Sequence, residues 1–241
     1  YTMLDAQELA PYIGFTENEV KELCKKYNRD FEQVKRWYDG YLLEEEQVYN
    51  PKAVVSLMMK GKYKSYWSDT GSYKVIVPLI NMDFDGLKTA IIEMLSGTSV
   101  KVETSSFEND TSSLTCKDDV LTYLIHLGYL GYDQEKEMAF IPNEEIRQEL
   151  GKAVKKRTWS ELADFQRESE ALLEATLDEN ATAVAAGIEK IHTEYVSSIS
   201  YNNENSLSSV LSIAYLSAME YYFKPIREFP TGRGFADFVF I

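Results

Sequence analysis

Cysteine and histidine are scarce in this sequence, with two residues of each kind among 241. Cys24 and Cys116 lie far apart, and each falls on the apolar side of an expected helix, so we expect two buried, reduced thiols. His126 and His192 have no cysteine, histidine or carboxylate cluster around them in the sequence. Zinc sites use such ligands at short, regular spacings, and we therefore expect no zinc.

Long apolar runs are also missing. A membrane-spanning helix needs roughly 18 to 20 apolar residues, and the best stretch, Val210 to Met219, is interrupted by two serines. The first residues, Tyr1 to Asp5, have neither the basic region nor the apolar stretch of a signal peptide. We expect no membrane association and a cytoplasmic location.

Cations are few relative to anions: 25 lysines and arginines stand against 39 acids, a formal charge of −14. Because cations that neutralise phosphates dominate affinity for nucleic acid, the chain as a whole is a poor candidate for unaided tight binding. Its two basic runs are typical of solvated faces. The second run is kept as a candidate nucleic-acid contact. The runs are Lys60, Lys62 and Lys64, and then Lys152, Lys155, Lys156 and Arg157.

Helix signals dominate what is present, so the predicted fold is mainly α (α+β overall). Thr16 to Glu19 reads as a capping box, and Asn50-Pro51 as a second helix start. Another helix is expected over 87–96, ending at Gly97. Periodicity predicts two long helices within 158–199, joined near Asp178, and a further helix over 206–223.

A different unit is expected between residues 114 and 154, after a polar loop over 98–113. A helix from Lys117 to Leu127 precedes two apolar runs, 129–133 and 138–141, which flank a short polar stretch and predict a β-hairpin. Asn143 is then expected to cap a helix to about Val154. The order helix, hairpin, helix is typical of a winged-helix-like module.

The phosphate-binding signatures of nucleotide sites are missing, because Gly61-Lys62 and Gly151-Lys152 lack both the upstream glycine and the hydroxyl residue. The C-terminal stretch is more informative. Strands are expected at 226–229 and 235–241, around the turn 231–234, with Asp237 on the second strand. A strand carboxylate beside a helix carboxylate is part of what a hard cation needs for phosphodiester hydrolysis. From the residues alone, a solvated strand-end acid is the preferred interpretation of Asp237, because surface acids are common.

Two groups of motifs together resemble the AAA-ATPase-like proteins that are fused to a PD-(D/E)XK nuclease-like domain. The early motifs are Trp37-Tyr38-Asp39-Gly40-Tyr41, Tyr49-Asn50-Pro51 and Tyr66-Trp67-Ser68-Asp69-Thr70-Gly71. The late ones are Tyr201-Asn202-Asn203-Glu204-Asn205-Ser206-Leu207 and 231–239. The resemblance covers nearly the whole chain in the same order.

This resemblance implies four regions: an ATPase-lid-like region over 1–105, a winged-helix-like module over 106–157, a helical connector over 158–200 and the start of a nuclease-like domain over 201–241. It also implies that Glu204 and Asp237 are catalytic, with Asp237 a metal ligand. The family's glutamate-x-lysine pair and its Walker elements are absent from these 241 residues. We therefore expect a continuation beyond Ile241.

By the same resemblance, we expect no cofactor in this chain and Mg²⁺ and ATP in the intact parent, which would be an ATP-regulated, Mg²⁺-dependent phosphodiesterase acting on nucleic acid. The chain alone, with both active sites incomplete, is expected to be inactive. An alternative is a non-catalytic module with a degenerate nuclease fold that binds protein or nucleic acid. An unrelated helical domain is the third interpretation.

Overall fold

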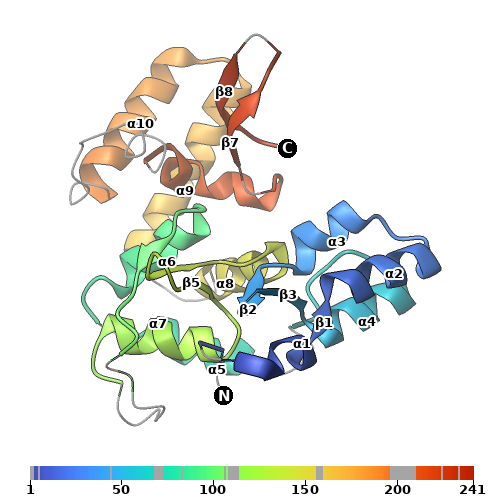
Figure 1. Ribbon diagram of the computed structural model, residues 1–241. Helices are drawn as coiled ribbons and strands as arrows, with labels where there is room; N and C mark the ends of the chain where they lie inside the picture. Colours follow the sequence, from blue (N-terminus) through green and yellow to red (C-terminus); the bar gives the residue numbers. More distant parts are fainter. Residues whose placement is uncertain are drawn as a thin grey trace. The chain divides into compact units, whose positions relative to one another are not determined.

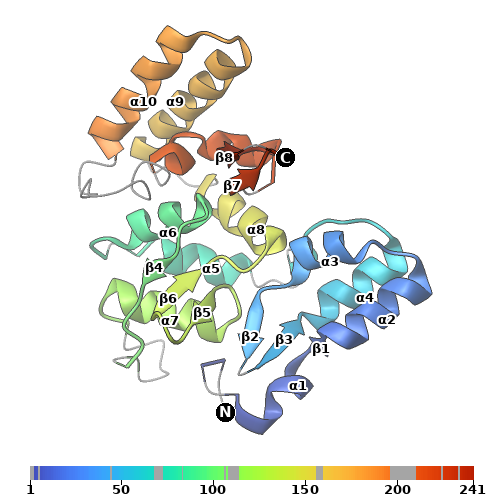
Figure 2. The ribbon, with the colours of Figure 1, turned by 45° about the horizontal axis from the view of Figure 1, so that its top comes forward.

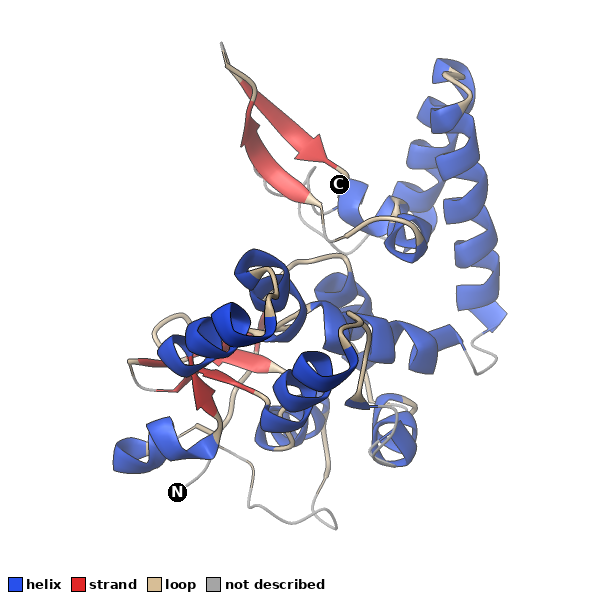
Figure 3. Cartoon of the chain, turned by 90° about the vertical axis from the view of Figure 1, so that its right-hand side faces the viewer, coloured by secondary structure: helices blue, strands red, loops and turns tan. Residues whose placement is uncertain are grey.

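The computed structural model describes eleven stretches of the chain and divides it into two compact units (Figure 1). The described residues are 3–4, 6–43, 45–67, 73–82, 84–105, 107, 114–155, 160–195, 210–223, 225–232 and 234–241. Unit 1 comprises residues 1–94 and 99–154, and unit 2 comprises residues 95–98 and 155–241. Most of the described chain is helical with small sheets, which confirms the mainly α (α+β) class (Figure 3).

The first part of unit 1 contains short helices around a three-stranded sheet. The helical elements are η1 (Gln7–Leu9), α1 (Ala10–Ile13), α2 (Glu17–Tyr27), α3 (Phe31–Tyr38) and α4 (Pro51–Lys60). The strands are β1 (Phe15–Thr16), β2 (Tyr41–Leu43) and β3 (Glu46–Tyr49), paired antiparallel in the order β1-β3-β2. Figure 2 shows α2, α3 and α4 packed together beside this sheet.

Both predicted helix starts are confirmed. The Glu19 amide and the Thr16 hydroxyl form the capping box of α2, in which the Thr16 amide donates to the Glu19 carboxylate at 2.8 Å. Asn50 caps α4 by accepting hydrogen bonds from the amides of Lys52 and Ala53. The sheet itself was not predicted, because its strands are two to four residues long and too short to show a period of two.

The second part of unit 1 follows the predicted order of helix, hairpin and helix. It contains α5 (Tyr73–Ile80), α6 (Leu87–Leu95), β4 (Val100–Lys101), α7 (Lys117–His126), β5 (Gly131–Asp133), β6 (Met138–Phe140) and α8 (Glu144–Lys155). The hairpin pairs Gly131 with Phe140 and Asp133 with Met138. The likeness to a winged helix stays a prediction.

Two expectations for this region are wrong, and one helix was not predicted. Residues 98–113 are not loop throughout, because β4 pairs with β6. Helix α5 was missed, and it contains Pro78, which normally discourages a helix prediction. Cys116 is exposed rather than buried, since it is the residue that precedes α7, where its amide donates to Asp119 at 3.2 Å.

Unit 2 contains α9 (Ser160–Leu177) and α10 (Ala181–Tyr195), which confirms the two long helices joined near Asp178. The predicted helix over 206–223 is wrong after Ala214, where the chain changes to the 3-10 helix η4 (Leu216–Glu220). There the Ser217 amide donates to the hydroxyl of Ser169 at 2.9 Å instead of continuing an α-helical ladder. Residues 201–209 lie outside the described residues.

Unit 2 also contains the predicted pair of strands, β7 (Ile226–Pro230) and β8 (Phe235–Val239), which run antiparallel. The amide of Thr231 donates to the carbonyl of Gly234 at 2.8 Å and closes the turn between them. The four functional regions predicted from the sequence do not follow the boundaries of the two units, and they stay a prediction.

Candidate functional site

The residues predicted for a nuclease-type site are only partly described. Asp237 lies on β8, as expected, and its strand is paired with β7. The side chain of Asp237 and the whole of Glu204 lie outside the described residues. The catalytic and metal-binding roles of these two acids therefore stay predictions.

The basic run that is predicted to contact nucleic acid is also only partly described. Lys152 lies on α8, and its Nζ is 3.0 Å from Oε1 of Glu149, so this charge is already offset within the helix. Lys155 is the last residue of α8, and Lys156 and Arg157 fall outside the described residues.

Two of the motifs that carry the family resemblance, 37–41 and 66–71, meet inside unit 1 around the first turn of α8. Asn143 connects the segment after α3 to the start of α8. Its Nδ2 donates to the carbonyl of Asp39 at 2.7 Å, and its Oδ1 accepts from the amide of Ile146 at 3.0 Å. Gly40 follows Asp39 with a φ of +110°, and a Cβ placed there would stand 2.3 Å from the carbonyl oxygen of Pro142. The segment after α3 thus lies directly against the start of α8.

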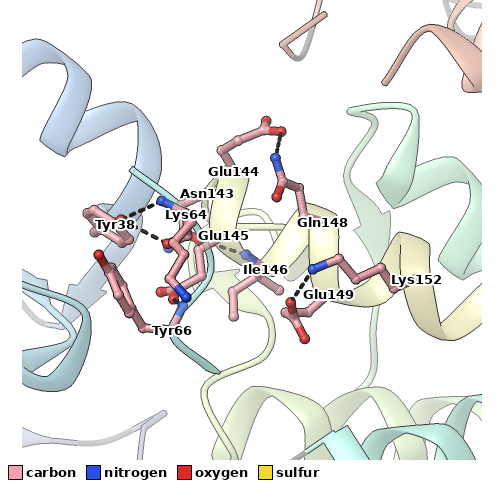
Figure 4. A network of polar contacts seen from close by, with 10 residues as sticks. All are labelled: Tyr38, Lys64, Tyr66, Asn143, Glu144, Glu145, Ile146, Gln148, Glu149 and Lys152. Carbon is pink, nitrogen blue, oxygen red and sulfur yellow. Dashed lines mark hydrogen bonds and ion pairs between the residues drawn. The ribbon is translucent and has the colours of Figure 1, made fainter. Parts of the chain in front are cut away.

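Glu145, the second residue of α8, is the buried acid at the centre of this region (Figure 4). Its Oε1 accepts a hydrogen bond of 2.6 Å from the backbone amide of Tyr66. Burial raises the pKa of Glu145 to about 7, even though the amides of Tyr66 and Trp67 lower it. Nearby Glu149 raises the pKa further, and Lys52 lowers it.

A second acid in the same turn is fully paired. Glu144 and Arg147 are both buried, and the guanidinium donates to the two carboxylate oxygens at 2.8 and 3.0 Å. Such a two-point contact offsets much of the cost of burying both charges. The pair stabilises the first turn of α8, and Gln148 donates a further hydrogen bond of 3.3 Å to Oε1 of Glu144.

Two tyrosines extend the network from the first motif. The hydroxyl of Tyr38 donates to the carbonyl of Lys64 at 2.9 Å and accepts from the Lys64 amide at 3.3 Å. The hydroxyl of Tyr41 donates to the carbonyl of Gly128 at 2.7 Å, and burial raises its pKa. Both hydroxyl groups are used to join distant segments, which indicates a structural role.

Beside this network lies a partly open cavity of about 180 Å³ in unit 1. Its walls are mostly apolar and include Tyr41, Leu43, Val48, Trp67, His126 and Gly128. Trp67 packs with its ring edge against Tyr129 at 4.5 Å between centroids. Burial lowers the pKa of His126, and its ring stacks on that of Phe107.

The polar contacts of this network join segments that are far apart in the sequence. In the part of the chain that the structure describes, no three His, Cys, Asp or Glu side chains are placed so that they could hold a metal ion. Within the same part, no helix is long and apolar enough to span a bilayer.

Sequence reasoning identified Asn143 as a helix cap but missed Glu145, because an acid in the first turn of a helix is normally exposed there. Its neighbour Ile146 and the apolar spacing of α8 are the only signals that this turn faces the core. The contact that matters, with the Tyr66 amide, joins residues 79 positions apart and leaves no local pattern.

The comparisons with known proteins add one distant relative. It is an uncharacterized protein encoded in the vnfD 5′ region of Azotobacter chroococcum mcd 1, which is 24% identical over 198 aligned residues. The alignment covers 78% of this chain and only 36% of the relative, so the chain spans about a third of that protein's length. No protein-family model and no solved structure matches the chain.

Proposed function

We propose that this chain is a segment of an ATPase–nuclease fusion protein, in which the nucleotide state controls a Mg²⁺-dependent phosphodiesterase that acts on nucleic acid. The observation that supports the proposal is the meeting of two separate sequence motifs, 37–41 and 66–71, around the first turn of α8. The motif residues Asp39, Gly40 and Tyr66 all contact residues 142–145. Motifs that meet in space belong to one structural unit, which favours a shared family origin over two chance matches.

The chemistry of the proposed site depends on Asp237 and Glu204. Mg²⁺ prefers carboxylate and other oxygen ligands, and it polarises a phosphate and lowers the pKa of bound water. Asp237 on β8 would supply one carboxylate and Glu204 a second. The glutamate-x-lysine pair of the family and the ATP site would belong to other parts of the parent protein. The length of the Azotobacter relative supports a parent with room for both.

The test uses the protein encoded by the complete reading frame, titrated with Mg²⁺ and Mn²⁺ by isothermal calorimetry. We expect one or two metal ions to bind the wild type, and the Asp237→Ala variant to lose at least one of them. The matched control is Asp133→Ala, which removes a half-buried carboxylate of the β5–β6 hairpin that is paired with Lys136, and it should leave metal binding unchanged. Equal metal binding by all three proteins would contradict the proposal.

A second candidate function is binding without catalysis, through a nuclease fold that has lost its activity. The observation that favours it is a group of exposed lysines, Lys60, Lys62 and Lys64, that the structure leaves without acidic partners among its described residues. A parent protein that binds nucleic acid but binds no divalent metal would favour this candidate over the first.

A further inference from the structure

The ends of α2 and α4 lie side by side in unit 1 and bring two short basic segments together. The Nη2 atom of Arg29 donates to the carbonyl of Met58 at 3.3 Å and stands 2.8 Å from where a Cβ on Gly61 would lie. The hydroxyl of Tyr63 donates to the carbonyl of Asp30 at 3.2 Å. Residues 25–30 and 60–64 therefore form one continuous surface.

This surface carries six cations and a single acid, Asp30, in a chain whose formal charge is −14. We call it the basic face; its cations are Lys25, Lys26, Arg29, Lys60, Lys62 and Lys64. The five lysines are exposed, and Arg29 is half-buried. The basic face is positively charged, whereas the remainder of the chain is acidic. It therefore creates a local positive potential that the rest of the chain does not share.

The described acidic side chains form no ion pair with the basic face. Among the described residues, none of its six cations lies within ion-pair distance of a carboxylate. Several lysines elsewhere are paired: Lys101 with Glu137, Lys136 with Asp133 and Lys152 with Glu149. The basic face combines a high local density of cations with the lack of such ion pairs to the described acids.

Helix ends account for only part of this charge. The C-terminus of a helix presents roughly half a negative charge, so α2 and α4 together offset about one of the cations. Asp30 offsets one more, and it also caps α3 by accepting from the Gln33 amide at 3.0 Å. Most of the positive charge of the basic face is left for an external anion.

Aromatic rings hold some of these cations in place and add a second kind of contact. The Nζ atoms of Lys60 and Lys64 stand 5.1 and 5.2 Å from the centroid of the Tyr66 ring, so the two are within about 10 Å of each other. Lys26 stands 5.6 Å from the ring of Tyr27, a side chain that is 40% exposed. Cations beside an exposed aromatic ring are the combination that binds the backbone and bases of single-stranded nucleic acid.

We propose that the basic face is a nucleic-acid-binding surface that contacts single strands through their phosphates, with Tyr27 available to stack on a base. The proposal takes its class of partner from the proposed function. It assigns the contact to the ends of α2 and α4 instead of to Lys152 and the residues that follow it. The acidic remainder of the chain disfavours long-range attraction, so binding is local and strongly dependent on salt.

The test measures fluorescence anisotropy of a labelled single-stranded oligonucleotide with the 241-residue chain, in excess EDTA. The absence of metal separates this result from the proposed nuclease activity. We expect binding at low salt that weakens by at least tenfold when Lys60, Lys62 and Lys64 are all changed to glutamate. The slope of log K against log salt should fall in magnitude by about 2, since each lost phosphate contact on a single strand contributes about 0.7.

The matched control changes three exposed, acid-paired lysines to glutamate, namely Lys101, Lys136 and Lys190. This control variant changes the net charge by the same amount. At low salt its affinity should fall by no more than about twofold, which is the loss expected from the change in net charge alone.

A second pair of variants tests the aromatic contact. Tyr27→Ala should weaken binding, and Tyr12→Ala, which removes an 83% exposed ring elsewhere in unit 1, should not.

Three results would overturn the proposal: no binding by the wild type, equal losses in the two triple variants, or equal competition by polyglutamate at the same concentration of charge. Equal competition by polyglutamate would indicate that the basic face binds acidic proteins. Circular dichroism melting of each variant separates loss of binding from loss of fold, and the double variant Lys25→Glu, Lys26→Glu provides an independent set of cations if the first triple variant unfolds.

Discussion

The backbone amide of Tyr66 donates a hydrogen bond of 2.6 Å to the buried carboxylate of Glu145, joining two segments 79 positions apart in the sequence. The acid has only 1% of its surface exposed, and its pKa is raised to about 7. Two consequences follow. The carboxylate holds the Tyr66–Trp67 segment in place, and its ionisation makes unit 1 sensitive to pH.

Glu145 should make stability fall as pH rises. A carboxyl group whose pKa is raised on folding binds its proton more tightly in the folded chain, so its contribution is complete below the unfolded value of 4.5 and is lost as pH rises through about 7. The loss is on the order of 3 kcal/mol. Urea denaturation between pH 5 and 8 measures it as the difference between the wild type and Glu145→Gln.

The comparison with Glu145→Gln is needed because other groups also titrate. Burial raises the pKa of Asp39, which acts in the same direction, and lowers the pKa of His126, which acts in the opposite one. Both contributions are present in both proteins and cancel in the difference. If the wild type and the variant show parallel pH profiles, Glu145 does not titrate in this range.

Asn143→Ala should destabilise the chain more than Asn50→Ala, although both remove the cap of a helix in unit 1. A lost cap costs about 1 kcal/mol, which is the expectation for Asn50. Removal of Asn143 also leaves the Asp39 carbonyl without its donor, which adds about 1–3 kcal/mol. Urea denaturation of the two variants measures the difference, and equal losses would show that the bond to Asp39 contributes nothing.

Gly40→Ala should be among the more damaging small substitutions. A methyl group there would meet the carbonyl oxygen of Pro142 at 2.3 Å, and the φ of +110° disfavours any side chain. Gly86→Ala is the control, because its φ is +78° and the nearest atom, on Lys117, is an ordinary 3.5 Å away. We expect about 1 kcal/mol for the control and several times that for Gly40→Ala in thermal or urea unfolding. Similar losses would mean that the segment moves away from Pro142 at little cost.

The two thiols should react at very different rates. Cys116 is exposed, whereas Cys24 is 3% exposed and burial raises the pKa of its thiol, which reduces the reactive thiolate. With Ellman's reagent we expect one rapid equivalent from the folded protein and a second only on unfolding. Cys116→Ser should remove the rapid equivalent, and a rapid phase that persists in this variant would place Cys24 at the surface.

Local signals allowed much of the fold to be predicted. The capping residues Thr16, Asn50 and Asn143 act within three residues of themselves, and their hydrogen bonds are those that the sequence indicates. The hairpin and the two long helices also have clear local patterns. The sheet of β1, β2 and β3 and the 3-10 turn at Ser217 depend on contacts far along the chain, such as the bond from Ser217 to Ser169.

The candidate sites also include features that local sequence patterns indicate and features that depend on contacts far along the chain. The acids Glu204 and Asp237 were predicted through the family resemblance, and their side chains are outside the described residues. The lysines at 60–64 were interpreted as a solvated face, because a sequence does not show that Arg29 lies beside them, against Met58 and Gly61. The pairing of Lys152 with Glu149 follows from their spacing of three residues on one helix, and this local signal could have lowered the weight given to the second basic run.

The most direct test of the ATPase–nuclease account is cleavage of a labelled oligonucleotide by the protein of the complete reading frame. We expect cleavage that requires Mg²⁺, changes in rate when ATP is added, and is lost in both Asp237→Ala and Glu204→Ala while the variants keep their fold. No cleavage by the wild type under any nucleotide condition, or cleavage that both variants retain in full, would contradict the account.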